Sequence, residues 1–136
     1  GERSVFSLPH GDIVLLDESY NANPASMRAA FATLAGVEVG FRGRRIAVVG
    51  DMLELGPEGP AAHRALAPAL AEAGVDLVFA VGPLMHHLWS VLPPERRGGY
   101  AETAAAMVDP LLAALRPGDA VTIKGSNGIR MARIVQ

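Results

Sequence analysis

Short apolar runs, separated by stretches long enough to form helices, constrain the fold of this chain more than any other sequence feature. These runs cover residues 13–16, 45–49, 77–81 and 120–123. A run of about four to eight mostly apolar residues between turn residues is typical of a strand that is buried on both faces. Strands that alternate with helices require crossover connections and favour a mostly parallel sheet. We therefore predict an α/β, Rossmann-like fold with helices on both faces of the sheet.

Weaker patterns predict the elements at the margins of this sheet. Residues 4–8 and 12–17 are expected to form an antiparallel hairpin at the N-terminal edge, across Pro9-His10-Gly11. Residues 99–101 are expected to form a short edge strand. Helices are predicted for residues 24–34, 60–73, 83–91, 103–115 and 128–135, with a kink at Pro68 in the second of them.

Size and composition limit the kinds of protein that this chain can be. The 136 residues fit one domain that spans residues 1–136. The net charge of −2 lacks the basic excess of a nucleic-acid-binding domain, so no nucleic-acid partner is expected. Without cysteine, disulfides and thiolate metal sites are excluded. No apolar run approaches the roughly 20 residues of a membrane span, and no signal peptide opens the chain, so we expect a cytoplasmic protein. Because the first residue is not Met, we expect an excised part of a longer protein.

The turn after the first apolar run carries an unusual set of polar side chains. It reads Asp17-Glu18-Ser19-Tyr20-Asn21-Ala22-Asn23-Pro24. Asn23 is suited to cap the following helix, with Pro24 as its first residue. Capping alone does not explain why Tyr20 and Asn21 join a carboxylate pair on one short turn. In an open α/β sheet such a turn lies at the carboxyl end of a strand, where ligands bind.

Two further loops follow predicted core strands and carry residues that can bind ligands. In Gly50-Asp51-Met52-Leu53-Glu54-Leu55-Gly56, two carboxylates follow a glycine that permits a tight exit from the strand. In Lys124-Gly125-Ser126-Asn127-Gly128, a cation and a hydroxyl stand beside glycines that free the backbone to approach an anion. The alternative role for Lys124 is to cap a neighbouring loop or to pair with Asp119. No Walker A or Gly-x-Gly-x-x-Gly pattern is present.

Other charged and ring-bearing residues are predicted to be structural. The four histidines lack metal-ligand spacing, so no metal site is predicted; they are His10, His63, His86 and His87. Trp89 and Leu88 are expected to pack on the sheet. The cluster of Arg42, Arg44 and Arg45 is expected to form a solvated rim, with contact to a phosphate as the alternative.

In this order, the three loops resemble the C-terminal domain of the Mur ligases, and the resemblance spans nearly the whole chain. The Tyr-Asn-Ala-Asn-Pro sequence at 20–24 is the specific motif, because sister ligases usually carry a Tyr-Ala-His-type sequence there. The family commonly has Arg after Lys-Gly-Ser, where this chain has Asn127, with Arg130 three residues later. Within the family, the motifs are most similar to those of the ligase that adds D-alanyl-D-alanine.

The resemblance implies a three-domain ligase of peptidoglycan precursor synthesis, of which this chain is the third domain. The implied reaction uses ATP to activate the carboxylate of UDP-MurNAc-tripeptide as an acyl phosphate. The amine of D-alanyl-D-alanine then attacks to form the amide. ATP and Mg would bind mainly to the central domain, which this chain lacks together with the N-terminal domain. The chain alone is therefore expected to hold no catalytic residue and to be inactive.

The resemblance also implies two groups of binding residues, which contact their ligands when this domain closes over the central domain. The residues expected to meet the nucleotide are Glu18, Tyr20, Asn21 and Asn23, while Asp17 helps to hold the turn. The residues expected to bind the dipeptide are Asp51, Glu54, Lys124, Gly125 and Ser126. Lys124 suits the dipeptide carboxylate, and Asp51 or Glu54 either receives its ammonium group or orients the loop.

Two other functions stay open at this point. One is a related ligase domain, such as that of a folylpolyglutamate synthetase, which would more commonly carry Asp-Gly-Ala-His-Asn-Pro, a sequence absent here. The other is a non-catalytic α/β binding domain. A P-loop domain encoded upstream in the same gene would distinguish the ligase from the binding domain.

Overall fold

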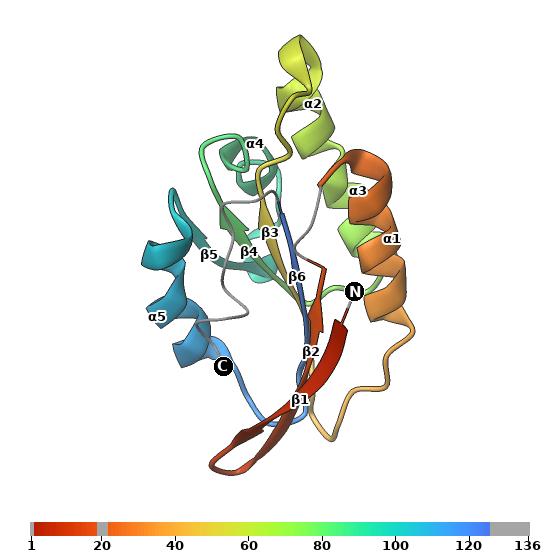
Figure 1. The fold of residues 1–136 in the computed structure, drawn as a ribbon, viewed down its shortest axis with the longest axis vertical. Coiled ribbons are helices and arrows are strands. Elements are labelled where there is room, and N and C mark those ends of the chain that lie inside the picture. The colour runs from red at the N-terminus through yellow and green to blue at the C-terminus, as the bar shows by residue number, and fades with distance from the viewer. Residues whose placement is uncertain (1, 19–21, 126–136) are drawn as a thin grey trace.

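A six-stranded sheet in the order β1-β2-β6-β3-β4-β5 forms the centre of the molecule (Figure 1). The computed structural model describes residues 2–18 and 22–125. The antiparallel pair is β1 with β2, and the other neighbouring strands are parallel. The strands are β1 (Glu2–Leu8), β2 (Gly11–Asp17), β3 (Arg45–Gly50), β4 (Leu77–Val81), β5 (Arg97–Ala101) and β6 (Ala120–Lys124). The predicted mostly parallel sheet with an antiparallel N-terminal edge is confirmed.

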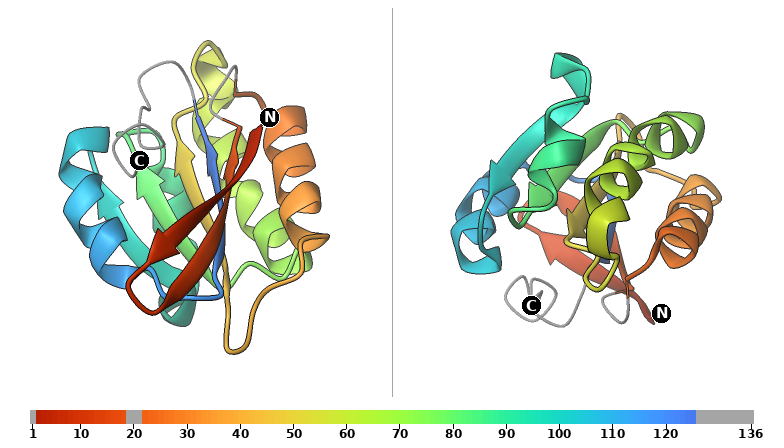
Figure 2. Two further views of the ribbon diagram at one scale, coloured as in Figure 1. Left: turned by 60° about the horizontal axis from the view of Figure 1, so that its bottom comes forward. Right: turned by 90° about the horizontal axis from the view of Figure 1, so that it is seen from above.

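Helices cover both faces of this sheet, as predicted (Figures 1 and 2). The described helices are α1 (Pro24–Ala35), α2 (Gly59–Arg64), α3 (Leu66–Glu72), α4 (His86–Trp89) and α5 (Ala104–Ala114), with short 3-10 turns η1 (Gly56–Glu58) and η2 (Pro94–Arg96). Helices α1 to α4 pack on one face and α5 on the other. The helix predicted for residues 128–135 lies outside the described residues.

Strand alternation divides the apolar core into two layers. On β3, Ala47 and Val49 point to the side of α1, whereas Ile46 and Val48 point to the side of α5. Phe31 of α1 fills the first layer, and it is 1% exposed. The near-continuous apolar sequence of the central strands thus follows from burial on both faces.

The predicted helix over residues 60–73 is two helices, α2 and α3, which meet at Ala65. Pro68 has no N–H with which to bond the carbonyl of Arg64, so a continuous helix would lack that bond. As the third residue of α3, Pro68 instead occupies the first turn, where backbone N–H groups have no intrahelical partner. The sequence therefore locates the disturbance correctly: the helix is interrupted at Ala65, whose backbone stays in the right-handed helical region.

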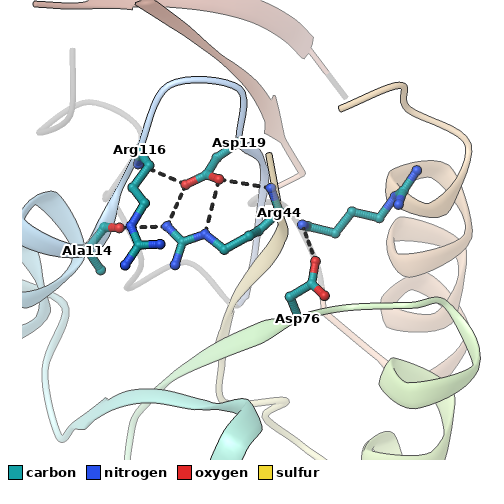
Figure 3. Close-up of polar contacts among 6 residues, drawn as sticks. Arg44, Asp76, Ala114, Arg116 and Asp119 are labelled. Atoms are coloured by element: carbon teal, nitrogen blue, oxygen red, sulfur yellow. Dashed lines mark hydrogen bonds and ion pairs between the residues drawn. The ribbon is translucent and has the colours of Figure 1, made fainter. Parts of the chain in front are cut away.

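The amino end of the sheet is held by a buried carboxylate, shown in Figure 3. Asp119 is fully buried and accepts hydrogen bonds from the Arg44 side chain at 2.8 and 3.2 Å. It also accepts from the backbone N–H groups of Arg44 at 2.9 Å and Arg116 at 2.8 Å. Arg45 donates its side-chain N–H groups to the carbonyls of Leu34 and Val37.

These contacts correct two expectations about charged residues. Arg44 and Arg45 join strands and helices to one another and do not form a solvated rim, although Arg42 is exposed as expected. Asp119 precedes β6 and Lys124 ends it, so the two residues lie at opposite ends of the same strand. Asp119 pairs with Arg44 instead of Lys124. Arg44 directly precedes β3, the neighbour of β6, and therefore lies at the same end of the sheet as Asp119.

Candidate ligand site at the carboxyl edge of the sheet

The three loops singled out in the sequence follow strands that are direct neighbours in the sheet. Strand β6 lies between β2 and β3, with Asp17 paired to Ile123 and Val49 paired to Lys124. The backbone N–H of Glu18 donates to the carbonyl of Ile123 at 2.9 Å, which extends the contact beyond β2. The sheet therefore brings the start of each loop to one edge, as the topological argument predicts.

Lys124 is the most unusual residue at this edge. It is the only lysine in the sequence, and only 6% of it is exposed. Alternation along β6 places it on the same side of the sheet as Ala120 and helix α1. Within residues 2–18 and 22–125, it forms no ion pair. Lysine is among the residues that are least often buried, so a nearly buried lysine at the carboxyl edge of the sheet is a candidate ligand-binding residue.

Asn23 caps helix α1, as the sequence predicts. Its side-chain oxygen accepts a hydrogen bond from the backbone N–H of Ser26 at 2.8 Å, and the Ser26 hydroxyl accepts from the Asn23 N–H at 3.0 Å. This reciprocal pair satisfies two backbone donors at the start of the helix. The turn is thus anchored on one side by the cap and on the other by the Glu18 contact to β6.

Asp51 fastens its loop to the start of α4. Its carboxylate accepts hydrogen bonds from the N–H groups of Leu84 at 3.2 Å and Met85 at 2.8 Å. Gly82, at φ +112°, lies so close that a Cβ atom there would collide with the Asp51 carboxylate. Glu54 is exposed and adopts φ +67°, in the left-handed region that few non-glycine residues occupy. The loop therefore has a fixed base at Asp51 and presents Glu54 outward.

His63 also holds this loop, a role that the sequence reasoning did not find. The ring is fully buried, and its Nε2 atom accepts the backbone N–H of Met52 at 3.0 Å. In the helix predicted over residues 60–73, the spacing of His63 with Leu66 and Leu70, at i, i+3 and i+7, would place all three on one face and could have indicated burial.

Aromatic residues border the site where α4 meets β5. The ring of Tyr100 lies 5.3 Å from that of His86 and 6.1 Å from that of Trp89. The Tyr100 hydroxyl donates to the carbonyl of Gly82 at 2.9 Å. Burial raises the pKa of Tyr100, and the negative charges of Glu102 and Asp51 raise it further. Leu88 is buried and Trp89 is half-buried, so the prediction that they pack on the sheet is confirmed.

Part of the predicted site lies outside the described residues, namely Tyr20, Asn21 and Ser126. Gly125, the residue before Ser126, is described and buried. In the described part of the chain, no three His, Cys, Asp or Glu side chains are grouped so as to hold a metal ion. Among the same residues, no helix is long and apolar enough to cross a membrane.

Comparison with known families agrees with this geometry. The model of the Mur ligase, glutamate ligase domain matches residues 6–127. Because the match covers most of the chain, the chain belongs to the family of Mur ligase C-terminal domains.

Within that family, several similar curated proteins carry the name UDP-N-acetylmuramoyl-tripeptide--D-alanyl-D-alanine ligase. The chain is 36% identical over 125 residues to the Escherichia coli (strain K12) ligase, covering 90% of the chain and 26% of the relative. It is 31% identical over 141 residues to the Mycobacterium tuberculosis (strain H37Rv) ligase, covering 90% of the chain and 28% of the relative. The chain thus spans about a quarter of the length of these relatives.

Solved structures show the same fold. MurF from Acinetobacter baumannii matches with a TM-score of 0.75 at 26% identity, over 97% of this chain and 28% of that one. MurF ligase from Thermotoga maritima, solved in complex with ADP, matches with a TM-score of 0.72 at 23% identity, over 96% of this chain and 28% of that one.

Proposed function

We propose that this chain acts as the C-terminal domain of a three-domain cytoplasmic ligase that adds D-alanyl-D-alanine to UDP-MurNAc-tripeptide. Its partners would be the N-terminal and central domains of the same protein. The names of the curated relatives support the reaction, and the share of their length that matches supports the domain assignment. The observation that carries the proposal within this chain is the nearly buried Lys124 at the edge shared by three polar loops.

In this proposal, Lys124 binds the carboxylate of the dipeptide. The residue is nearly buried, and low exposure to water strengthens attraction to a carboxylate relative to an exposed lysine. Gly125 leaves the backbone open to approach, and Ser126 adds a hydroxyl donor. The outward position of Glu54 suits it to the dipeptide ammonium group. Asp51, whose carboxylate accepts from the backbone just before α4, contributes negative charge to the base of the same loop.

The turn between β2 and α1 would meet the nucleotide. Glu18, Tyr20 and Asn21 offer a carboxylate, a phenol and an amide, groups that hydrogen-bond well to ribose hydroxyls. Asn23 contributes mainly by fixing the turn, since its side chain caps α1. The ADP bound to the Thermotoga maritima relative is consistent with a nucleotide in this class of proteins.

The chemical steps would take place on the central domain, with this domain closing over it. ATP would activate the tripeptide carboxylate as an acyl phosphate, and the dipeptide amine would displace phosphate to form the amide. Closure would exclude water, which otherwise hydrolyses the acyl phosphate, and would hold the amine near the reacting carbon. The proposal assigns Mg and most of the ATP contacts to the central domain.

Lys124→Met in the three-domain ligase tests the dipeptide assignment, because Met keeps the apolar stem and removes the charge. A charge-assisted hydrogen bond of about 1.5–3 kcal/mol corresponds to an increase of about 10- to 150-fold in the KM for D-alanyl-D-alanine. The KM for ATP should change by less than about twofold, since the nucleotide contacts lie on another loop.

Arg28→Met is the matched control, because it removes an exposed cation from the side of α1. We expect this variant to keep both KM values. Equal KM values for the dipeptide in Lys124→Met and the wild type would refute the assignment of Lys124.

A further inference from the structure

We propose that His63 is a positioning residue for the dipeptide site, because its ring fixes the loop that carries Asp51 and Glu54. The inference rests on the proposed function for its kinetic consequence, whereas the structural part can be tested without activity. The ring is fully buried in α2 and reaches the loop across a sequence separation of 11 residues. No ligand contact is assigned to His63, so it acts through the backbone of Met52.

The hydrogen bonds define which nitrogen of the ring carries the proton. The N–H of Met52 can only donate, so Nε2 of His63 must be the unprotonated acceptor at 3.0 Å. Nδ1 lies 2.6 Å from the carbonyl of Gly59, which can only accept. Nδ1 therefore carries the proton, and the neutral ring joins the backbone of α2 to the backbone of the loop.

Two adjacent residues of the loop are consequently fixed from opposite sides. Asp51 accepts hydrogen bonds from the two N–H groups just before α4, and Met52 is bound to His63 and buried in the core. The next residues project outward: Leu53 is 53% exposed, and Glu54 adopts φ +67°. A left-handed non-glycine residue persists only where its surroundings determine the backbone. The Met52–His63 bond supplies that constraint immediately before Leu53 and Glu54.

A core histidine that only stabilises the fold is the competing explanation, and two substitutions distinguish it. The amide of Asn reaches the position of Nδ1, so His63→Asn keeps a donor to Gly59 and loses the acceptor for Met52. The amide of Gln reaches the position of Nε2, so His63→Gln keeps the acceptor for Met52 and loses the donor to Gly59. Each variant loses one buried hydrogen bond, so a purely structural role predicts similar effects from both.

Amide hydrogen exchange in the 136-residue chain directly tests whether His63 fixes the backbone at Met52. We expect the Met52 N–H to exchange at least about tenfold faster in His63→Asn than in His63→Gln, measured against core amides of β3 in the same samples. Equal exchange of the Met52 N–H in the two variants, once scaled to those core amides, would overturn the positioning role, whether or not the proposed function holds.

Steady-state kinetics of the three-domain ligase test the consequence for the dipeptide site. His63→Asn should raise the KM for D-alanyl-D-alanine about tenfold over the wild-type value, whereas His63→Gln should keep it within about threefold of that value. The KM for ATP should stay within about twofold of the wild-type value in both variants. Parallel loss for both substrates, or in both variants, would overturn the inference. If Lys124→Met leaves the dipeptide KM unchanged, the proposed function fails, and the exchange of the Met52 N–H still decides the role of His63.

Discussion

Removal of the Asp119 carboxylate should destabilise the domain more than any other single change to a charged side chain described above. Asp119→Ala leaves Arg44 without its buried partner and removes the acceptor of the backbone N–H groups of Arg44 and Arg116. The carboxylate is completely buried, while 19% of the Arg44 side chain is exposed. Loss of the carboxylate therefore creates an unpaired, largely buried guanidinium group.

The size of the effect follows from this geometry. Breaking a buried ion pair from one side costs about 3–5 kcal/mol. Because Arg44 can reach water, and still donates to the carbonyl of Ala114, the lower part of that range applies, about 3 kcal/mol. Asp119→Asn keeps one acceptor oxygen and the volume of the side chain, so its cost should be smaller, about 2 kcal/mol. Domains of this kind have a total stability of about 5–15 kcal/mol, so both losses are measurable.

Urea denaturation of the 136-residue chain, followed by circular dichroism, measures these differences in the free energy of unfolding. Asp109→Ala is the control, since it removes an exposed carboxylate from α5 and should change stability by less than about 0.5 kcal/mol. A loss below about 1 kcal/mol for Asp119→Ala, or one equal to that of the control, would refute the reasoning from burial.

Two further predictions concern Tyr100, which lies in β5, and Gly82, which follows β4. Because the pKa of Tyr100 is raised in the folded state, its contribution to stability is complete below the unfolded pKa near 10 and is lost as pH rises through the folded pKa. In urea denaturation above pH 10, the wild type should therefore lose more stability than Tyr100→Phe. Equal dependence of the free energy of unfolding on pH in the two proteins would contradict this. Gly82→Ala should lower the free energy of unfolding by at least about 2 kcal/mol, because the new Cβ atom meets the Asp51 carboxylate at a positive φ. Gly36→Ala, at φ −84°, is the control for Gly82→Ala and should lower the free energy of unfolding by less than about 0.5 kcal/mol. Similar losses for the two variants would show that the close approach of Asp51 to Gly82 has no effect.

The sheet could be predicted from the sequence because its signals are local. The apolar runs that form β3, β4 and β6 are buried on both faces, so hydrophobicity alone marks them. Asn23 and Pro24 mark the start of α1 in the same way, since a cap and its helix are adjacent in sequence. From the order of such elements, general topological rules then place the polar loops at one edge.

The polar contacts that hold the loops could not be predicted, because they join distant parts of the chain. Arg44 and Asp119 are 75 residues apart, and an arginine-rich segment before a strand is equally typical of a solvated surface. The contacts of Asp51 with the segment before α4 span 33 to 34 residues, so the sequence offered loop orientation as one of two roles for this carboxylate but could not identify its partners. His63 was not recognised because a single histidine on a helix indicates no partner until the opposing backbone is known.

The position of β6 also determines when the sheet can form. The strand is the last of those described, yet it lies between β2 and β3, so it joins a β1-β2 ribbon to a β3-β4-β5 unit. Until residue 120 has left the ribosome, each of these units has an unpaired inner strand of apolar sequence, and such an edge can pair with another chain. Closure of the sheet then requires contacts across more than 100 residues between β2 and β6, which slows folding because loop-closure entropy is lost before those contacts form. The same strand that brings the three loops together therefore leaves two apolar strand edges unpaired in the newly made protein until it is inserted.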